Sequence, residues 1–171
     1  MPGKPARFAD LLRVLNEHGV EYVLVGALAA VLQGAPVSTF DVDIVQRRTP
    51  ENVDRLLAAL RSLHAFYWEH VGRRLEPEGR ALRGAGHHLL ETDLGRLDVL
   101  GEIGAGRDYE ALAVRAETVV IAPGLDVRVL ALEAVIETKR ETGRSKDLAA
   151  LPMLEELLQE LRWRRGSPPA G

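Results

Sequence analysis

The sequence predicts an α+β fold (α/β mixed) in which a mixed β-sheet is flanked by helices and followed by a C-terminal helical extension. Three observations predict it: an apolar run at 20–25 that ends in glycine, two strand–turn–strand patterns, and helical periodicity in the last part of the chain. The chain has 171 residues, of which 46% are hydrophobic, and this suits one domain with a normal core. We expect a core at 1–130, helices packed on it at 131–165, and a disordered tail at 166–171.

The N-terminal third alternates helix and strand signals. Apolar residues from Phe8 to Leu15 have helical spacing, and Gly19 can stop that helix. The run from Val20 to Val25 predicts a buried strand, and the small residues after it predict a helix as far as Leu32. The next expected elements are a strand at 42–45 and a helix that Thr49 caps, with Pro50 at its first position and apolar residues Val53, Leu56, Leu57 and Leu60 on one face.

The middle of the chain predicts β-structure around turns. Between His70 and Gly86 the periodicity disappears, so we expect a loop with a short strand or a turn of helix. Asp93-Leu94-Gly95 separates two short strand patterns and predicts a hairpin of 88–92 with 96–100. A short helix at 108–113 and a second strand pair, 118–121 with 127–130, complete the expected core.

The C-terminal part is helical. Leu132, Val135, Ile136 and Lys139 share one helix face. Gly143 breaks that helix, Ser145 is expected to cap the next, and Pro152 is expected to kink or restart it. Leu154, Leu157, Leu158 and Leu161 continue an apolar stripe, which raises dimerisation through this helix as a third functional hypothesis.

The composition excludes several classes of protein. The formal net charge is −3, so any nucleic-acid binding must use a local patch. Cysteine is absent, which excludes disulfides, thiolate zinc sites and cysteine catalysis. No apolar run approaches the roughly 20 residues needed to span a bilayer, and the start of the chain lacks a signal-peptide stretch. We expect a cytoplasmic protein that does not enter a membrane.

Asp41-Val42-Asp43 is the most informative stretch of the chain. Residues i and i+2 of a strand project from the same face, so the two carboxylates are expected side by side. Like charges repel, and holding such a pair among apolar neighbours is costly unless a cation lies between them. The pattern predicts a site for a hard metal ion that prefers oxygen ligands, namely magnesium.

Gly26 marks the junction between the first strand and the helix that follows. Such a junction presents free backbone N–H groups and the positive end of a helix dipole, which suit a phosphate. Glycine lets a ligand approach the backbone closely. Strand–glycine–helix turns are common, and the Asp-x-Asp strand about 15 residues later is what strengthens the phosphate interpretation.

The segment from Gly26 to Asp43 resembles the motif of the nucleotidyltransferase superfamily of the DNA polymerase β type. That motif is an apolar strand, Gly followed by Gly or Ser, a short helix, and Asp-x-Asp on the next strand. The segment is similar, more closely, to the small nucleotidyltransferase-like proteins related to the toxin of AbiE-type toxin–antitoxin systems, with Ser38-Thr39 leading into the acids as in that group. The resemblance covers about residues 20–150 and implies a nucleotidyltransferase-like sheet.

The resemblance also implies a third carboxylate on a neighbouring strand, and the segment 95–100 nominates Asp98. Three carboxylates can hold two Mg²⁺ ions, with Asp41 and Asp43 bridging them and Asp98 binding the second ion and helping to deprotonate an acceptor. The plainer alternatives are a strand cap for Asp41, a solvated acid for Asp43 and a harmless exposed strand position for Asp98. Nucleotide binding is expected from Gly26, Ala27, Ser38, Thr39, Lys139 and Lys146.

The two lysines belong to a segment, 139–148, that resembles the basic helix-turn-helix corner of the same relatives. They would neutralise a triphosphate or contact RNA, and ordinary charged helix ends are the equal alternative. Asp147 is interpreted as a first-turn helix acid. Arginines at 73–83 alternate with Glu76 and Glu78, so a solvated loop is at least as well supported as an RNA patch.

Aromatic and imidazole side chains before the hairpin receive plainer interpretations. Tyr67 and Trp68 are interpreted as rim or core aromatics. His87 and His88 are adjacent, so their side chains point to opposite faces of a strand and are poorly placed to share a metal ion.

The leading functional hypothesis is a metal-dependent transfer of a nucleoside monophosphate from an NTP to a hydroxyl of RNA, with tRNA as one option, or of protein. The resemblance also implies a cognate antitoxin protein as a partner. Ala27 stands where the pattern has a second Gly or Ser, and Val37 stands where close relatives often carry arginine. These departures motivate the alternative, a catalytically weak or inactive nucleotide- or protein-binding module with the same fold. The sequence does not indicate an oligomeric state.

Overall fold

The structure of the protein is a computed structural model that describes residues 7–166. The helices are α1 (Phe8–Glu17), α2 (Gly26–Leu32), α3 (Pro50–Ser62), α4 (Gly79–Leu82), α5 (Tyr109–Ala113), α6 (Leu132–Thr142) and α7 (Ser145–Gly166). The strands are β1 (Tyr22–Val25), β2 (Asp41–Gln46), β3 (Phe66–Tyr67), β4 (His87–Thr92), β5 (Gly95–Leu100), β6 (Ala116–Ala122) and β7 (Leu125–Leu130).

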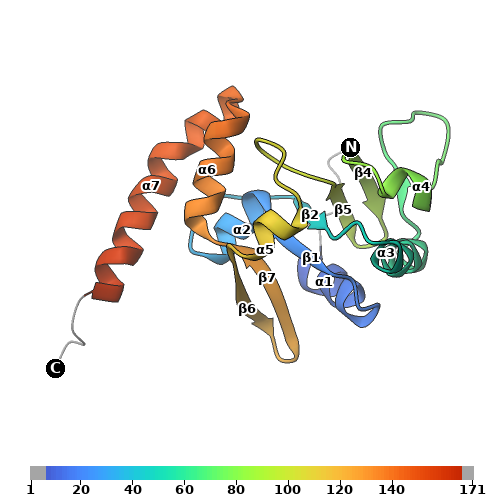
Figure 1. The fold of residues 1–171 in the computed structure, drawn as a ribbon, viewed down its shortest axis with the longest axis horizontal. Coiled ribbons are helices and arrows are strands. Elements are labelled where there is room, and N and C mark those ends of the chain that lie inside the picture. The colour runs from blue at the N-terminus through green and yellow to red at the C-terminus, as the bar shows by residue number, and fades with distance from the viewer. Residues whose placement is uncertain (1–6, 167–171) are drawn as a thin grey trace.

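The seven strands form one mixed sheet in the order β3-β4-β5-β2-β1-β7-β6. Two neighbouring pairs, β2 with β5 and β1 with β7, are parallel, and the other four are antiparallel. Helices flank the sheet, and α6 and α7 lie together on one side of the molecule, away from α1 and α3 on the other (Figure 1). This mixed sheet with flanking helices confirms the predicted α+β class.

Local sequence signals explain most of the elements. Thr49 caps α3 by accepting a hydrogen bond from the backbone N–H of Asn52, and Pro50 follows in the first turn. Asp108 caps α5 in the same way, through the N–H of Ala111. Gly143 ends α6 in the left-handed conformation that favours glycine. Each of these signals was readable from residue type and position alone.

The core is aliphatic, as the low aromatic content indicates. Leucine, valine, isoleucine and alanine supply nearly all of its buried hydrophobic side chains, and Leu11, Leu12, Leu15, Leu24, Ile44, Leu56, Leu60, Leu90 and Leu97 are among the largest that are fully buried. Burial of aliphatic side chains between the helices and the sheet is the main stabilising term. Within the described range, no helix is both long enough and apolar enough to cross a membrane.

The C-terminal helix differs from the prediction at three points. It continues through Pro152, so the proline does not restart it. It begins at Ser145, which leaves the preceding Arg144 in the capping position rather than the serine. Gly166, expected in a disordered tail, is the last residue of α7, and the rest of that tail lies outside the described residues. Packing of α7 along α6 supports the helix across the proline, where local propensity alone would end it.

Asn52 fastens the start of β1 to the end of β2. Its side chain is fully buried. Its Oδ1 accepts from the N–H of Glu21 at 2.7 Å, and its Nδ2 donates to the carbonyl oxygens of Glu21 at 2.9 Å and of Arg47 at 2.8 Å. Glu21 precedes β1 and Arg47 follows β2, so one amide satisfies backbone groups of both strands where they leave the sheet.

Asn52→Ala should destabilise the protein by about 2–4 kcal/mol, because it removes three buried hydrogen bonds and leaves the Glu21 carbonyl with only the N–H of Arg47. Urea unfolding measures this change. Glu51→Ala, at an exposed position of the same helix turn, is the matched control and should cost less than about 0.5 kcal/mol. Equal costs for the two variants would mean that water replaces the amide and that Asn52 does not fasten the strands.

Candidate active site

The three predicted acids lie on two neighbouring strands of the sheet. Strands β2 and β5 pair in parallel, in a register that sets Asp43 directly beside Asp98 and Asp41 beside Arg96. Because side chains two residues apart share a face, Asp41, Asp43, Arg96 and Asp98 all project from one side of the sheet. We call this side the acid face. The common face of Asp41 and Asp43 follows from their spacing on β2, and the strand pairing brings Asp98 to them.

Asp43 and Asp98 form a carboxyl pair with one shared hydrogen bond. Burial, followed by the charges of Asp43 and Asp41, raises the pKa of Asp98 to about 7, and Asp98 is the donor that holds the proton. Burial also raises the pKa of Asp43, while the hydrogen bond from Asp98 acts in the opposite direction. Two adjacent carboxylates ionise in two steps, so the second negative charge of the pair forms only as pH rises through about 7.

Gly26 provides the space that Asp43 occupies. Its φ is +70°, and a Cβ at this position would lie 2.2 Å from Asp43 Oδ2 and 3.1 Å from Asp43 Cβ. Both the left-handed conformation and the close approach require glycine. The turn from β1 into α2 thus carries no side chain where it meets the acid pair, and Gly26 is part of the same wall as Asp43.

Asp41 lies one pleat away from the pair, and its Oδ1 is buried without a hydrogen-bond partner. Arg96, its neighbour in register, places its guanidinium over the ring of Trp68 at 4.4 Å instead of on Asp41. An orphaned buried carboxylate oxygen is costly, so a cation or a donor is expected at this position when the site is in use. The charge of Asp41 reaches both members of the pair and raises the pKa of each.

The donor set fits a hard divalent cation in its chemistry. Carboxylate oxygens are the ligands that Mg²⁺ prefers. Across residues 7–166, however, no group of three His, Cys, Asp or Glu side chains is arranged to hold a metal ion together. Asp43 and Asp98 are hydrogen-bonded to each other instead. An ion would replace that hydrogen bond and its proton.

Asp43 and Asp98 open into a cleft of about 740 Å³ between the acid face and the corner that joins α6 to α7. Its other walls are the loop after β5, with Glu102 and Gly104, and the α6 residues Thr138 and Lys139. This volume is within the usual range for a site that holds a nucleotide-sized ligand. Thr138 and Glu102 were not foreseen as cleft residues, because no local pattern marks them and only the fold brings them to the acids.

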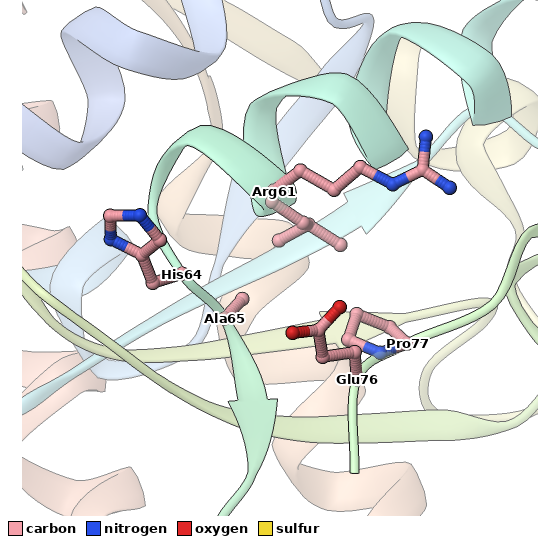
Figure 2. A pocket seen from close by; sticks show the side chains of 6 residues that line it. Arg61, His64, Ala65, Glu76 and Pro77 are labelled. Atoms are coloured by element: carbon pink, nitrogen blue, oxygen red, sulfur yellow. The ribbon is translucent and has the colours of Figure 1, made fainter. Parts of the chain in front are cut away.

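The hollow beside the end of α3 is much smaller, about 70 Å³. Figure 2 shows that the His64 ring and the Arg61 guanidinium extend away from each other there, so they do not converge on a common point. A third hollow, between α1 and α2, is almost entirely apolar. The cleft at the acid pair is therefore the strongest candidate for chemistry among the hollows considered.

Lys139 reaches the cleft from α6 and is held by a buried acid. Its Nζ lies 3.2 Å from Asp147 Oδ1, and Arg144 Nε lies 2.7 Å from Asp147 Oδ2. Asp147 is only 5% exposed. Burial opposes its ionisation, but the hydrogen bonds from Arg144 and Lys139 lower the pKa of Asp147 below its ordinary value. Asp147 does stand in the first turn of α7, as predicted, and it also fixes two cations at the cleft.

The remaining predicted nucleotide-binding residues lie farther from the cleft. Lys146 is exposed, yet its charge lowers the pKa of Asp43, as that of Lys139 does. Ala27, Ser38 and Thr39 are not among the residues that line the cleft. Thr39 Oγ1 instead donates to the carbonyl oxygen of Asp41 at 3.2 Å, which supports the start of β2.

The two histidines of β4 point to opposite faces, as predicted. His87 lines the cleft. His88 is buried on the other side, where it shares a hydrogen bond of 2.8 Å with the hydroxyl of Tyr67. Burial lowers the pKa of His88, so the neutral ring is favoured there.

Comparison with solved structures identifies the fold. The structure is similar to TM1012, a candidate nucleotidyltransferase from Thermotoga maritima, with a TM-score of 0.53 and 21% identity over 90% of this chain and 91% of the other. It is also similar to the antibiotic-resistance factor ANT(2'')-Ia, with a TM-score of 0.54 and 16% identity over 92% and 90% of the two chains. ANT(2'')-Ia in complex with adenylyl-2''-tobramycin gives 0.50 and 18% over 91% and 95%.

These similarities confirm the predicted nucleotidyltransferase-like fold, and at this level of identity they carry no more than the fold. No protein-family model and no curated protein matches the sequence. The closer likeness to AbiE-type toxins therefore stays a prediction from the motif.

Gly26→Ala should be destabilising beyond the cost of its backbone conformation. Gly124 is the matched control, because its φ is +71° and nothing lies within 4 Å of a Cβ placed there. Gly124→Ala should cost about 1 kcal/mol, the strain of a left-handed alanine. Gly26→Ala should cost at least about 1 kcal/mol more, because the new methyl group displaces Asp43.

Chemical unfolding of both variants, with Asp43→Ala added to each, measures the coupling energy between the glycine position and Asp43. If Asp43→Ala leaves the excess cost of Gly26→Ala unchanged, the contact is not its cause.

Asp98→Asn should stabilise the metal-free protein at about pH 8. The pKa of Asp98 is raised from 3.8 to about 7 in the folded protein, so the folded state binds more protons than the unfolded state between these values. Stability contributed by this group is present at low pH and is lost as pH rises toward 7. The amide avoids that loss, and we expect a gain on the order of 1 kcal/mol after allowing for solvent screening, or roughly 2–4 °C in Tm.

Thermal melts in a chelator across the range from about pH 5 to about pH 8 measure this difference. Asp126→Asn, an exposed acid on β7, is the control and should leave the pH profile unchanged. A difference between Asp98→Asn and the wild type that does not grow with pH would argue against a shared proton in the pair.

Proposed function

We propose that the protein is a metal-dependent nucleotidyltransferase that moves a nucleoside monophosphate from an NTP to a hydroxyl of RNA or protein. The observation that carries this proposal is the Asp43–Asp98 pair on the acid face, open to a cleft, in a fold shared with nucleotidyltransferases. Perturbed acids in a cleft are frequent at catalytic sites. Their strand positions also match the Asp-x-Asp motif and the third carboxylate of the superfamily that the sequence resembles.

Two Mg²⁺ ions are part of the proposal. Asp41, Asp43 and Asp98 would hold them, and the orphaned Oδ1 of Asp41 is the feature that most needs such a partner. Bound divalent ions would neutralise triphosphate charge and make an acceptor hydroxyl a better nucleophile.

The chain's own groups account for the proton and the leaving group. The acceptor hydroxyl oxygen would form a bond to the α-phosphorus, the bond from that phosphorus to the bridging oxygen would break, and pyrophosphate would leave. Asp98 would take the hydroxyl proton as the general base. Lys139, with Lys146 beyond it, would offset the charge of the departing phosphates, and Asp147 would keep the Lys139 ammonium in place.

Gly26 and Ala27 would offer backbone N–H groups to the phosphates. Ala27 lacks the hydroxyl of the motif, and Val37 lacks the arginine of close relatives. These two positions favour the alternative function, a weak or inactive binding module with the same fold. Calorimetry separates the two functions: Mg²⁺-dependent NTP binding without turnover supports the module, and turnover supports the enzyme.

The biological setting that goes with the enzyme is a cytoplasmic toxin–antitoxin pair, following the likeness to AbiE-type toxins. Expression with and without the product of the adjacent reading frame tests it. Growth arrest that needs Asp43 and Asp98, and that the neighbouring product relieves, is the expected result. Arrest by variants lacking both acids would assign toxicity to another cause.

The Asp41→Asn/Asp43→Asn double variant should lose transfer activity by at least about 10³-fold, because it removes two of three carboxylates that would hold the metal ions. The assay follows labelled nucleotide from each of the four NTPs into cellular RNA or lysate protein with Mg²⁺. Asp126→Asn is the matched strand-acid control and should retain full activity. Equal labelling by the double variant and the wild type would refute the catalytic role of these acids.

A further inference from the structure

The edge of the sheet beside the acid pair carries two arginine–aromatic stacks. Phe66 lies in β3, and Trp68 follows two residues later. The guanidinium of Arg74 lies over the Phe66 ring at 4.3 Å, and that of Arg96 lies over the Trp68 ring at 4.4 Å. Trp68 is 38% exposed. We call these four residues the stacking edge.

The stacking edge belongs to the acid face. Arg96 is two residues before Asp98 on β5, so both side chains project from the same side. The ring of Trp68 lies under Arg96 and is therefore on that side as well. Phe66 pairs in register with Glu91, and Glu91 pairs with Arg96, which places Phe66 on the same side.

The distance between the stacking edge and the acid pair follows from the strand pairings that connect them. Trp68 donates its N–H to the carbonyl oxygen of Leu89, Leu89 pairs with Asp98, and Asp98 pairs with Asp43. Neighbouring strands are about 4.8 Å apart, so Trp68 is roughly 10 Å from Asp98 across the sheet. Leu89 lines the cleft between them. Val25 and Gly26, the proposed phosphate side, lie beyond Asp43 at the opposite end of this row.

The guanidinium of Arg96 has a long ion pair with Glu91, and that of Arg74 is held by a backbone carbonyl. Arg96 Nε is 3.5 Å from Glu91 Oε2, and it is buried with no hydrogen-bond partner. Arg74 Nη2 donates to the carbonyl oxygen of His64 at 3.0 Å. Glu76 and Glu78 follow Arg74 in the same segment, so positive and negative side chains lie together there. The edge offers flat cationic and aromatic faces rather than a strong positive potential.

Resting on the proposed function, we propose that the stacking edge binds the acceptor as unpaired RNA, with successive bases stacked on the Trp68–Arg96 and Phe66–Arg74 pairs. Two residues of a strand span about 6.6 Å, which is close to the spacing of bases in an extended single strand. Aromatic rings and guanidinium planes on a sheet are the surfaces on which proteins stack unpaired RNA bases. The base on Trp68 would bring its ribose hydroxyl toward Asp98, on the side of the acid pair away from Gly26.

A single tryptophan can report this binding directly. In a Trp163→Phe background Trp68 is the sole tryptophan, and an unpaired RNA of about six nucleotides should quench its fluorescence as a base stacks on it. The titration uses no NTP and no metal, so its result does not depend on catalysis. Binding should fall only modestly with salt, since stacking on two arginine–aromatic pairs neutralises few phosphates.

Substitution should weaken RNA binding in a graded way. By anisotropy with labelled RNA, Trp68→Leu should lose about tenfold or more in affinity. Arg96→Lys should lose affinity as well, because lysine keeps the charge and lacks the plane. Trp163→Leu is the matched control and should bind as the wild type does. In the transfer assay, Trp68→Leu should raise KM for RNA, with kcat and the KM for NTP unchanged.

The outcomes separate this proposal from the proposed function. RNA binding that Asp41→Asn/Asp43→Asn retains and Trp68→Leu loses supports the stacking edge, even if no transfer is found. Transfer that Trp68→Leu performs with unchanged KM, or transfer only to protein, overturns the stacking edge and leaves the proposed function standing. Absence of RNA binding by the wild type also overturns it.

NTP alone is a further control in the fluorescence titration. If NTP quenches Trp68 as strongly as RNA does, the Trp68 ring belongs to the site of the donor nucleotide, and the proposal is overturned.

Discussion

The parallel pairing of β2 with β5 is the constraint on which the rest of this site depends. Its register fixes Asp43 beside Asp98, and a shift of one residue would send one carboxylate to the opposite face of the sheet. The buried aliphatic side chains between these strands and the helices hold that register, and Asn52 fastens the outer ends of β1 and β2. The apolar core therefore enforces a contact between two acids that would otherwise repel each other.

Other features of the cleft follow from accommodating that contact. The left-handed Gly26 removes the one side chain that would collide with Asp43. A single proton is retained between the two carboxyls, and the pKa of Asp98 rises to about 7. Two cations come to the cleft from the α6–α7 corner on one buried acid, Asp147. Gly26 gives the acid pair space, and the charge of Lys139 lowers the pKa of Asp43.

The sequence was most informative where the chemistry is local. Caps such as Thr49, the break at Gly143 and the alternation of Asp41 with Asp43 depend only on neighbouring residues, and these predictions match the structure. Pro152 does not restart the helix, which was one of the two outcomes expected for it, because packing along α6 outweighs its helix-breaking tendency. The position of Asp98 beside Asp43 was reached only through a family resemblance. Spacing could not give the strand order, and the same limit hid Thr138 and the stacks of Arg74 and Arg96.

A purely structural role explains the acid face poorly. Replacing a buried polar pair with apolar residues of similar size is often neutral or stabilising, so Asp43 and Asp98 are not what core stability alone would favour. Asp41 adds a second cost, because its Oδ1 is buried without a hydrogen-bond partner. Arg96 is its neighbour in register, but the guanidinium of Arg96 lies over the ring of Trp68 instead. The same arginine therefore links the two proposals. By stacking on Trp68 it leaves the acids free for cations, and it supplies the flat charged surface on which an acceptor base would rest.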